Sequence, residues 1–427
     1  MFLGFKIMNL KLLKLDIIKL LLNNLYPISL YARQIAGTFV LLLIARYLSV
    51  YDYGLFSSYK NIATFCLMFA NLGFNEYILV SSKANIKFVQ KKVALLVVNA
   101  IILTLILSSF SIFTPLENHL LFILVMFRTF FDGVFFALIL PYFQATKNFI
   151  TISYINIVYS LCIILITVIS YILKLSLINF LILNIIIGLF NFLQCVKYAD
   201  LKIFKIFYFL KNIRKLIDKS IWSYIITALC YYLYNQIPPL YIATYVSKEK
   251  AALFFSAFTM TSIIKILISS FNQKILPELI NKNVSEIKRI LKQNINILFM
   301  LILGILIFFS IFGKILLVLF YGHQEYANAN IVLIILSISL LGTALDFIYG
   351  AYISSCGKQK FKIPIQICGI ILSFILLFFL KRFDILGVSI TCCVSSLFVG
   401  IMYTLYSLKL LSVTENKVNI NEKYMAR

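Results

Sequence analysis

Apolar residues form long runs along the whole chain, and short polar or charged stretches separate them. An apolar run of about 18 or more residues can cross the roughly 30 Å hydrocarbon core of a bilayer as an α-helix. The pattern therefore predicts an all-α, polytopic membrane protein with twelve transmembrane helices. The predicted spans cover residues 27–48, 55–80, 92–113, 120–143, 150–173, 175–196, 221–246, 251–273, 295–320, 328–352, 363–380 and 385–408.

The segments between the spans alternate in charge. Those on one side of the membrane, including both termini and Lys92 at the edge of the third span, hold 28 of the 39 Lys and Arg residues. Those on the other side hold only Lys174, Lys248, Lys250, Lys381 and Arg382. Because Lys and Arg accumulate on the cytoplasmic side, we expect both termini in the cytoplasm. The same asymmetry accounts for the net charge of +24, which favours contact with anionic lipids rather than with nucleic acid.

Composition narrows the class of function. The chain is 62% hydrophobic and 13% charged, which excludes an ordinary soluble protein. The outer segments are short and contain no paired carboxylates and no nucleophile with a base, so we do not expect an enzyme. The eight cysteines form no CxxC motif and fit apolar packing. The two histidines are isolated, so we expect neither a metal site nor a cofactor.

An internal repeat divides the chain. IARYLSVYDYGLF (Ile44–Phe56) matches IATYVSKEKAALF (Ile242–Phe254) at six of thirteen positions, and the copies follow the first and seventh spans. Six spans in each half give a parallel repeat, in which substrate sites lie between the halves. We expect two pseudo-symmetric six-helix bundles around a central cavity. The predicted parts are an N-terminal cytoplasmic or interfacial segment (1–26), a first half (27–199), a basic cytoplasmic linker (200–220), a second half (221–408) and a cytoplasmic tail (409–427).

Charged residues inside the spans mark the candidate site, because a charge in the membrane interior is costly and usually functional. Arg128 and Asp132 stand four residues apart in an apolar run, so they share a helix face and can pair. The pair either locks two helices together or lines a wet cavity. Basic residues outnumber acids at depth, so a cavity would favour an anion, and arginine suits a phosphate group in particular.

The sequence predicts two sets of site residues, with a lipid diphosphate head group as the ligand of the first. The candidates for substrate binding are Arg33, Lys60, Arg128, Lys265, Asn235 and Gln236. The candidates for ion coupling are Asp132, Asp346 and Glu76. Pro238 and Pro239 in the seventh span predict a break or kink in its helix.

Three segments of the sequence resemble motifs of a known protein family. Arg46-Tyr47-Leu48 followed by Tyr53-Gly54, the segment NQIPPLYIATYVSKEKAALFFSAF in the second half, and FYGHQEYANANIVLIIL at 320–336 are similar to the polysaccharide flippases of the multidrug/oligosaccharidyl-lipid/polysaccharide exporter superfamily. The resemblance covers nearly the whole chain. The chain departs from the family at Pro238, where relatives often carry an acid.

The resemblance implies a flippase for O-antigen or capsular repeat units. Its substrate would be an undecaprenyl-diphosphate-linked oligosaccharide, moved from the inner to the outer leaflet of a bacterial inner membrane. It also implies coupling to a proton or sodium gradient, and partnership with the polymerase and chain-length proteins of lipopolysaccharide or capsule assembly. The alternatives are a cation-coupled drug or metabolite exporter of the same superfamily, a lipid II flippase, which usually has further spans, and a membrane scaffold for glycan assembly.

Overall fold

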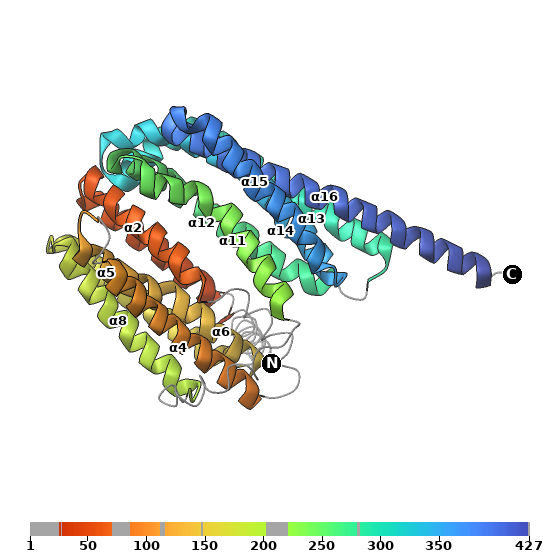
Figure 1. Ribbon diagram of the computed structural model, residues 1–427, viewed down its shortest axis with the longest axis horizontal. Helices are drawn as coiled ribbons and strands as arrows, with labels where there is room; N and C mark the ends of the chain where they lie inside the picture. The colour runs from red at the N-terminus through yellow and green to blue at the C-terminus, as the bar shows by residue number, and fades with distance from the viewer. Residues whose placement is uncertain are drawn as a thin grey trace, which may run out of the picture. The chain divides into compact units, whose positions relative to one another are not determined.

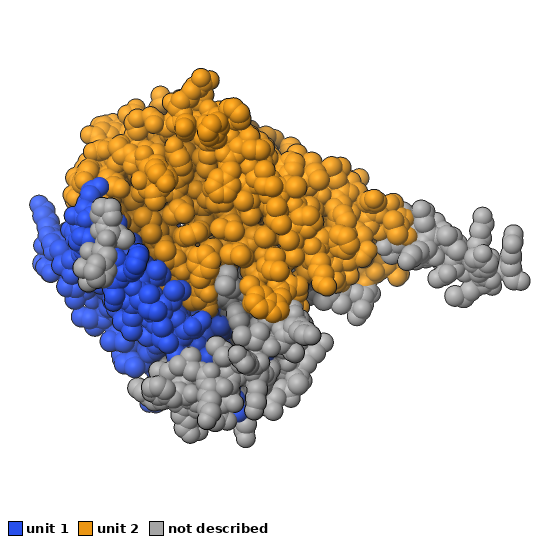
Figure 2. All heavy atoms as spheres, in the orientation of Figure 1, with its two compact units in different colours: residues 1–41, 75–217 blue, residues 42–74, 218–427 orange. Residues whose placement is uncertain are grey.

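The computed structural model of the protein describes residues 25–26, 28–70, 86–111, 116–146, 148–201, 221–279 and 282–425. Over these residues all regular secondary structure is helical. The chain forms two compact units (Figure 2), which we call unit 1 (residues 1–41 and 75–217) and unit 2 (residues 42–74 and 218–427). The predicted segments 1–26 and 200–220 lie almost wholly outside the described residues.

Unit 1 is a helical bundle. Helices α5 and α6 continue one another through a short π-helix, η1, and α4, α5, α6 and α8 run alongside one another (Figure 1). Helix α4 packs against α5 and α6, and α8 packs against α5 and α7. Its elements are α4 (Ile86–Ser111), α5 (His119–Thr129), η1 (Phe130–Val134), α6 (Phe135–Ala145), α7 (Phe149–Ile172) and α8 (Leu177–Tyr198). The first helix, 28–47, begins in unit 1 and ends in unit 2.

Unit 2 is built around α14, which packs against α12, α13 and α16 (Figure 1). Its longer elements are α2 (Val50–Met68), α11 (Ile221–Tyr245), α12 (Lys248–Leu279), α13 (Val284–Tyr321), α14 (Asn330–Ser355), α15 (Lys362–Leu380) and α16 (Asp384–Met425). Three short 3₁₀-helices connect the last four of these helices: η3 (Gln324–Ala329), η4 (Gln359–Phe361) and η5 (Lys381–Phe383). Helix α2 is part of unit 2, whereas it lies in the predicted first half, residues 27–199. The units are defined by contacts and the halves by the repeat, so the division into two six-helix halves stays a prediction.

Each of the twelve predicted spans overlaps a helix within the described residues. Within those residues, nine helical stretches are long and apolar enough to cross a membrane, and the last, Gln359–Val413, contains α15 and most of α16. The predicted span 221–246 falls on α11, and the described part of 55–80 falls on α2 as far as Met68. The polytopic, all-α fold is therefore confirmed. Two helices are longer than their spans: α13 begins at Val284 and α16 ends at Met425, because hydropathy marks only the apolar part of a helix.

The two prolines of the seventh span do not break their helix. Helix α11 continues through Pro238 and Pro239 to Tyr245, so of the predicted break or kink the break is absent, and the kink stays a prediction. Proline lacks the amide that would donate to the carbonyl four residues earlier. The carbonyls of Tyr234 and Asn235 therefore lose their helical donors, which membrane helices tolerate where other groups can satisfy them.

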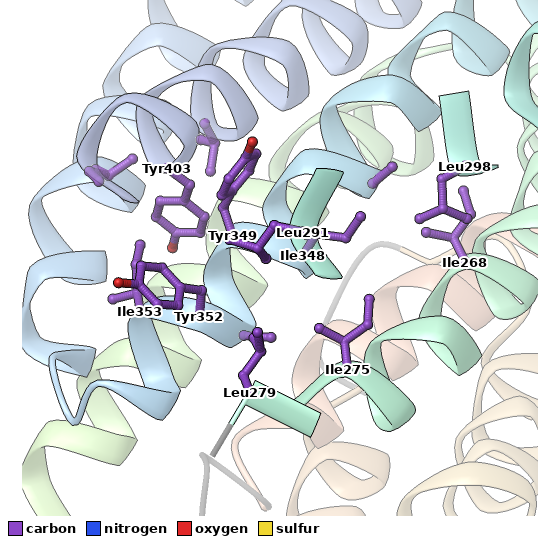
Figure 3. Packing of buried hydrophobic residues seen from close by; sticks show 14 of the residues in the cluster. Ile268, Ile275, Leu279, Leu291, Leu298, Ile348, Tyr349, Tyr352, Ile353 and Tyr403 are labelled. Carbon is purple, nitrogen blue, oxygen red and sulfur yellow. The ribbon is translucent and has the colours of Figure 1, made fainter. Parts of the chain in front are cut away.

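Aliphatic and tyrosine side chains fill the core of unit 2 (Figure 3). Ile268 and Ile275 of α12 and Leu298 of α13 lie beside Ile348 of α14, and Tyr403 of α16 belongs to the same buried cluster. Helices α12, α13, α14 and α16 thus share one hydrophobic core. Their packing holds the polar side chains that lie between these helices in fixed positions.

The two copies of the internal repeat meet inside unit 2. Gly54 of α2 lies so close to the first residue of α12, Lys248, that an added Cβ would stand 1.7 Å from the Lys248 carbonyl oxygen. The neighbouring Tyr53 is buried against the rings of Tyr321 and Tyr326, with centroids 5.8 and 6.2 Å away. The Tyr-Gly of the first copy therefore has a packing role at the start of α12.

Candidate functional site

Arg33 lies on the first helix, buried among side chains of unit 1. Its Nη1 donates to Asn156 Oδ1 (3.5 Å) and its Nη2 to the backbone oxygen of Asp132 (2.9 Å). The guanidinium carbon is also 4.0 Å from the ring centroids of Phe136 and Tyr159, which sandwich it. Such rings attract a cation electrostatically. Arg33 is 7% exposed, so its charge is fixed in one place by polar and aromatic partners.

The predicted pair of Arg128 and Asp132 is present in unit 1. Arg128 Nε lies 3.2 Å from Asp132 Oδ2, and the Arg128 guanidinium lies 5.6 Å from the ring centroid of Phe180. The Tyr159 hydroxyl donates to the other carboxylate oxygen of Asp132. Tyr159 thus contacts both charges, since its ring lies on Arg33 and its hydroxyl on Asp132.

A π-helix places this carboxylate. The turn Phe130–Val134 contains Asp132, and the Phe135 amide donates to the Phe130 carbonyl five residues earlier. Helix α8 approaches the turn closely, because a Cβ on Gly188 would stand 2.5 Å from Phe131 Cβ. Single π-turns inside helices are frequent at functional sites. The sequence predicts the extent of this helix but gives no sign of the wider turn.

We call Arg33, Arg128, Asp132, Asn156 and Tyr159 the unit 1 cluster. It carries two guanidinium groups and one carboxylate. The side chain of Asp132 is 28% exposed, whereas that of Arg128 is only 6% exposed. The carboxylate therefore stands at the accessible side of the cluster, and the arginines lie behind it.

A second cluster in unit 2 surrounds Asp346 of α14, which is 6% exposed. The hydroxyl of Tyr234, on α11, donates to Asp346 Oδ2 at 3.0 Å. A Cβ on Gly350 would stand 3.5 Å from Asp346 Oδ1 and 3.6 Å from Lys362 Nζ, so the carboxylate and this ammonium group lie on the same side of α14. Lys362 also donates to Ser354 Oγ at 2.7 Å.

A polar pocket adjoins this cluster within unit 2. The pocket has a volume of about 20 Å³, measured at the centre of a water-sized sphere, which is enough for one water molecule. Lys265 of α12 contributes the charge of the pocket, and its Nζ lies 5.4 Å from the ring centroid of Phe258. The lining residues are Tyr234, Asn235, Pro238, Phe258, Thr261, Lys265, Leu336, Ser339, Cys392, Ser395 and Ser396. The pocket thus combines one cation with amide and hydroxyl groups.

The predicted site residues fall into these two clusters with three exceptions. Lys60 on α2 and Gln236 on α11 are half-buried side chains of unit 2 outside the pocket lining. Glu76 lies outside the described residues. No group of three or more potential metal ligands occurs among the residues that the structure describes, and the eight cysteines are free thiols.

Sequence reasoning missed two residues of the unit 1 cluster, Asn156 and Tyr159. Both lie on α7, three residues apart and therefore on one helix face. Asn156 also donates to Ser29 Oγ at 3.3 Å, which ties α7 to the first helix. A buried amide and a hydroxyl at this spacing in an apolar run are the available signal, but the sequence does not say that Arg33 lies opposite.

Three solved structures have a fold similar to that of this chain. The protein is similar to an inward-facing multidrug resistance MATE family transporter of the MOP superfamily, at 14% identity over 90% of this chain and 96% of that chain, with a TM-score of 0.63. It is also similar to a MOP superfamily transporter from Pyrococcus furiosus (15%, 91% and 95%, 0.61) and to the lipid II flippase MurJ in an inward closed conformation (17%, 90% and 87%, 0.61).

At these identities the likenesses establish the fold, which is the two-lobe helical fold predicted by the sequence. Among curated proteins, none matches the sequence. A family model described as polysaccharide biosynthesis protein matches residues 25–280, which is more than half of the chain. The match covers every residue of the unit 1 cluster as well as Tyr234 and Lys265. The protein therefore belongs to the polysaccharide biosynthesis protein family.

Proposed function

We propose that the protein is a flippase that moves an undecaprenyl-diphosphate-linked oligosaccharide from the inner to the outer leaflet of a bacterial inner membrane. The proposal makes it a transporter rather than an enzyme, with both termini cytoplasmic. Family membership supports a role in polysaccharide biosynthesis. Two of the structural neighbours, a lipid II flippase and MATE transporters, move molecules across or within membranes on the same fold.

The buried arginine pair of unit 1 is the observation that carries the proposal. Arg128 pairs with the Asp132 carboxylate and Arg33 donates to the Asp132 backbone oxygen, so two guanidinium groups lie beside one acid and the cluster keeps a positive excess inside an apolar bundle. A guanidinium presents a planar fork of donors that matches phosphate oxygens, and it keeps its charge at any physiological pH. A diphosphate head group is the lipid anion that suits it.

In the proposed cycle Asp132 controls access to the arginines. While ionised it holds Arg128 through its carboxylate. When it is neutralised, its hold on Arg128 weakens and Arg128 can bind the diphosphate, while the remaining candidates Lys60, Lys265, Asn235 and Gln236 offer polar contacts for the rest of the substrate. The lipid tail stays in the bilayer. Alternating access of the two halves then exposes the head group to the other leaflet.

The test is the leaflet on which the lipid-linked oligosaccharides sit. In a strain deleted for the gene, completed units should accumulate on the cytoplasmic face, where a probe that cannot cross the membrane does not reach them. Wild-type protein should restore export, and Arg128→Ala should not, although it reaches the membrane in normal amount. The matched control is Lys314→Ala, because Lys314 is an exposed base on α13. Normal export with Arg128→Ala would remove this residue from the site.

The alternative function is a cation-coupled drug or metabolite exporter. It is favoured by one observation, the greater exposure of Asp132 than of Arg128, since an accessible acid suits a cationic ligand. The deletion strain separates the two functions. An exporter would leave the oligosaccharides on the outer leaflet and raise sensitivity to cationic drugs, whereas a flippase would do the reverse.

A further inference from the structure

We propose that the outward side of α13 carries a binding site for an anionic phospholipid of the inner leaflet, built from Arg289 and Lys292. The site lies in unit 2, on the surface of the protein, and shares no residue with the pocket or with the unit 1 cluster. The inference needs only a chain that spans a membrane, so it goes beyond the proposed flipping and does not depend on it.

Helix α13 has one side in the core of unit 2 and the other side exposed. Its buried residues Leu291, Leu298 and Ile302 follow one another at spacings of seven and four and belong to the core. Large exposed apolar side chains extend over residues 297–320, and the most exposed of them, Met300, is 73% exposed. At 1.5 Å per residue this stretch is about 36 Å long, which is enough to cross a hydrocarbon core of about 30 Å. The exposed side of α13 therefore faces lipid tails.

Two bases continue this lipid-facing side beyond its apolar part. Arg289 precedes Met300 by eleven residues, and Lys292 precedes Leu303 by the same number. Eleven residues are close to three full turns of a helix, so the members of each pair project in the same direction. Both bases are exposed. A lipid whose tails lie along Met300 and Leu303 thus has its head group beside Arg289 and Lys292.

The distance along the helix places the bases at the level of the head groups. Lys292 stands five residues, or about 7.5 Å, before Ile297, and Arg289 stands about 12 Å before it. The polar region of a bilayer extends about 5–8 Å beyond the hydrocarbon on each side. Lys292 therefore lies near the lipid phosphates, and the long side chain of Arg289 bends toward them. Because this end of α13 is on the predicted cytoplasmic side, the lipid belongs to the inner leaflet.

The acid of this segment does not cancel the two bases. Glu286 pairs with Lys282, whose Nζ lies 3.1 Å from Glu286 Oε2. Arg289 and Lys292 make no ion pair and no hydrogen bond to any residue that the structure describes. Lys288 adds a third exposed base next to them. Each base near a membrane surface strengthens the binding of anionic lipid by about fivefold, so this end of α13 has a clear preference for negative charge.

The side chains also match the chemistry of a phospholipid head group. A guanidinium binds a phosphate through two parallel hydrogen bonds, and a lysine adds a mobile point charge. Gln293 and Asn296 are exposed amides between the bases and the apolar part, at the level of the ester oxygens, to which an amide can donate. The ammonium group of a zwitterionic lipid is repelled by the bases. The site therefore selects a head group with a net negative charge.

Quenching of a local tryptophan by brominated lipids tests the site without any transport assay. Trp222 is the only tryptophan of the chain, so Met300→Trp in a Trp222→Phe background reports only the lipids beside α13. The protein is reconstituted in phosphatidylcholine that contains brominated phosphatidylglycerol, and separately brominated phosphatidylcholine. We expect phosphatidylglycerol to quench more strongly at equal mole fraction. Arg289→Gln and Lys292→Gln should each lower this preference about fivefold.

The matched control is Lys314→Gln, which removes an exposed base from the same helix. Lys314 lies fourteen residues after Met300, about 21 Å along the helix, so its loss should leave the quenching unchanged. An equal loss of preference in Lys314→Gln would show a general effect of charge and would overturn the proposal. A preference that survives Arg289→Gln and Lys292→Gln together, or no preference at all, would overturn it too.

Inorganic pyrophosphate separates a phospholipid site from a diphosphate site. Added at constant ionic strength, it should leave the preference for phosphatidylglycerol in place. If pyrophosphate removes the preference, the bases bind a diphosphate, and the phospholipid site is wrong. The substituted side chains are exposed, so the variants keep the packing of α13. The leaflet assay measures flipping separately, so a failure here leaves the proposed function standing.

Discussion

The close approach of α2 to the start of α12 at Gly54 allows a direct test of the packing in unit 2. An alanine Cβ at this position would stand 1.7 Å from the carbonyl oxygen and 3.2 Å from the Cα of Lys248. Both are backbone atoms, so no side chain can turn aside and α2 must move away from α12. Overpacking of this kind costs about 1–3 kcal/mol. Alanine recovers about 1 kcal/mol of helix propensity relative to glycine. We expect Gly54→Ala to lower stability by up to about 2 kcal/mol.

The control is Gly304→Ala on α13, where an added Cβ meets no atom within 4 Å. This change should be neutral or stabilising by up to about 1 kcal/mol, from helix propensity alone. Thermal unfolding of the purified variants in detergent measures both, with the same helix-propensity gain in each. Gly54→Ala should unfold below wild type and below Gly304→Ala. Equal unfolding temperatures for the two variants would refute the contact between α2 and the start of α12.

Three further predictions use the same preparation. Gly342→Ala should also unfold below wild type, because its Cβ would stand 2.3 Å from the backbone carbonyl carbon of Ser396; a rise would contradict this packing. Arg33→Lys should lose about 1–2 kcal/mol, since a lysine cannot stack its charge flat between Phe136 and Tyr159; unchanged unfolding would show that the stacking adds little. Tyr159→Phe should weaken export of the lipid-linked oligosaccharide, because it removes the hydroxyl that donates to the Asp132 carboxylate and keeps the ring. Export equal to wild type would exclude a role for the hydroxyl.

The local part of the candidate site could be read from the sequence. Arg128 and Asp132 are four residues apart, and the helix that carries them brings them together whatever surrounds it. The π-turn at Phe130–Val134 is different, because no local pattern in the sequence marks it, although α8 lies close to it at Gly188 in the fold. The prolines of α11 show the same limit: their local preference predicts a break or a kink, and the helix continues through them without a break.

The sequence by itself determined that this is a membrane protein and where its helices run. In the hydrocarbon of a bilayer, a spanning segment must be apolar and must satisfy its backbone hydrogen bonds internally, as a helix does. Each segment meets this requirement through its own residues, so the sequence of that segment alone predicts it. Only the tertiary structure decided which charges meet. Arg33 donates a hydrogen bond to Asn156, which is more than a hundred residues away in the sequence, and Asp346 accepts one from Tyr234 on another helix. Such contacts depend on packing between helices of similar apolar composition, for which many pairings look alike in the sequence.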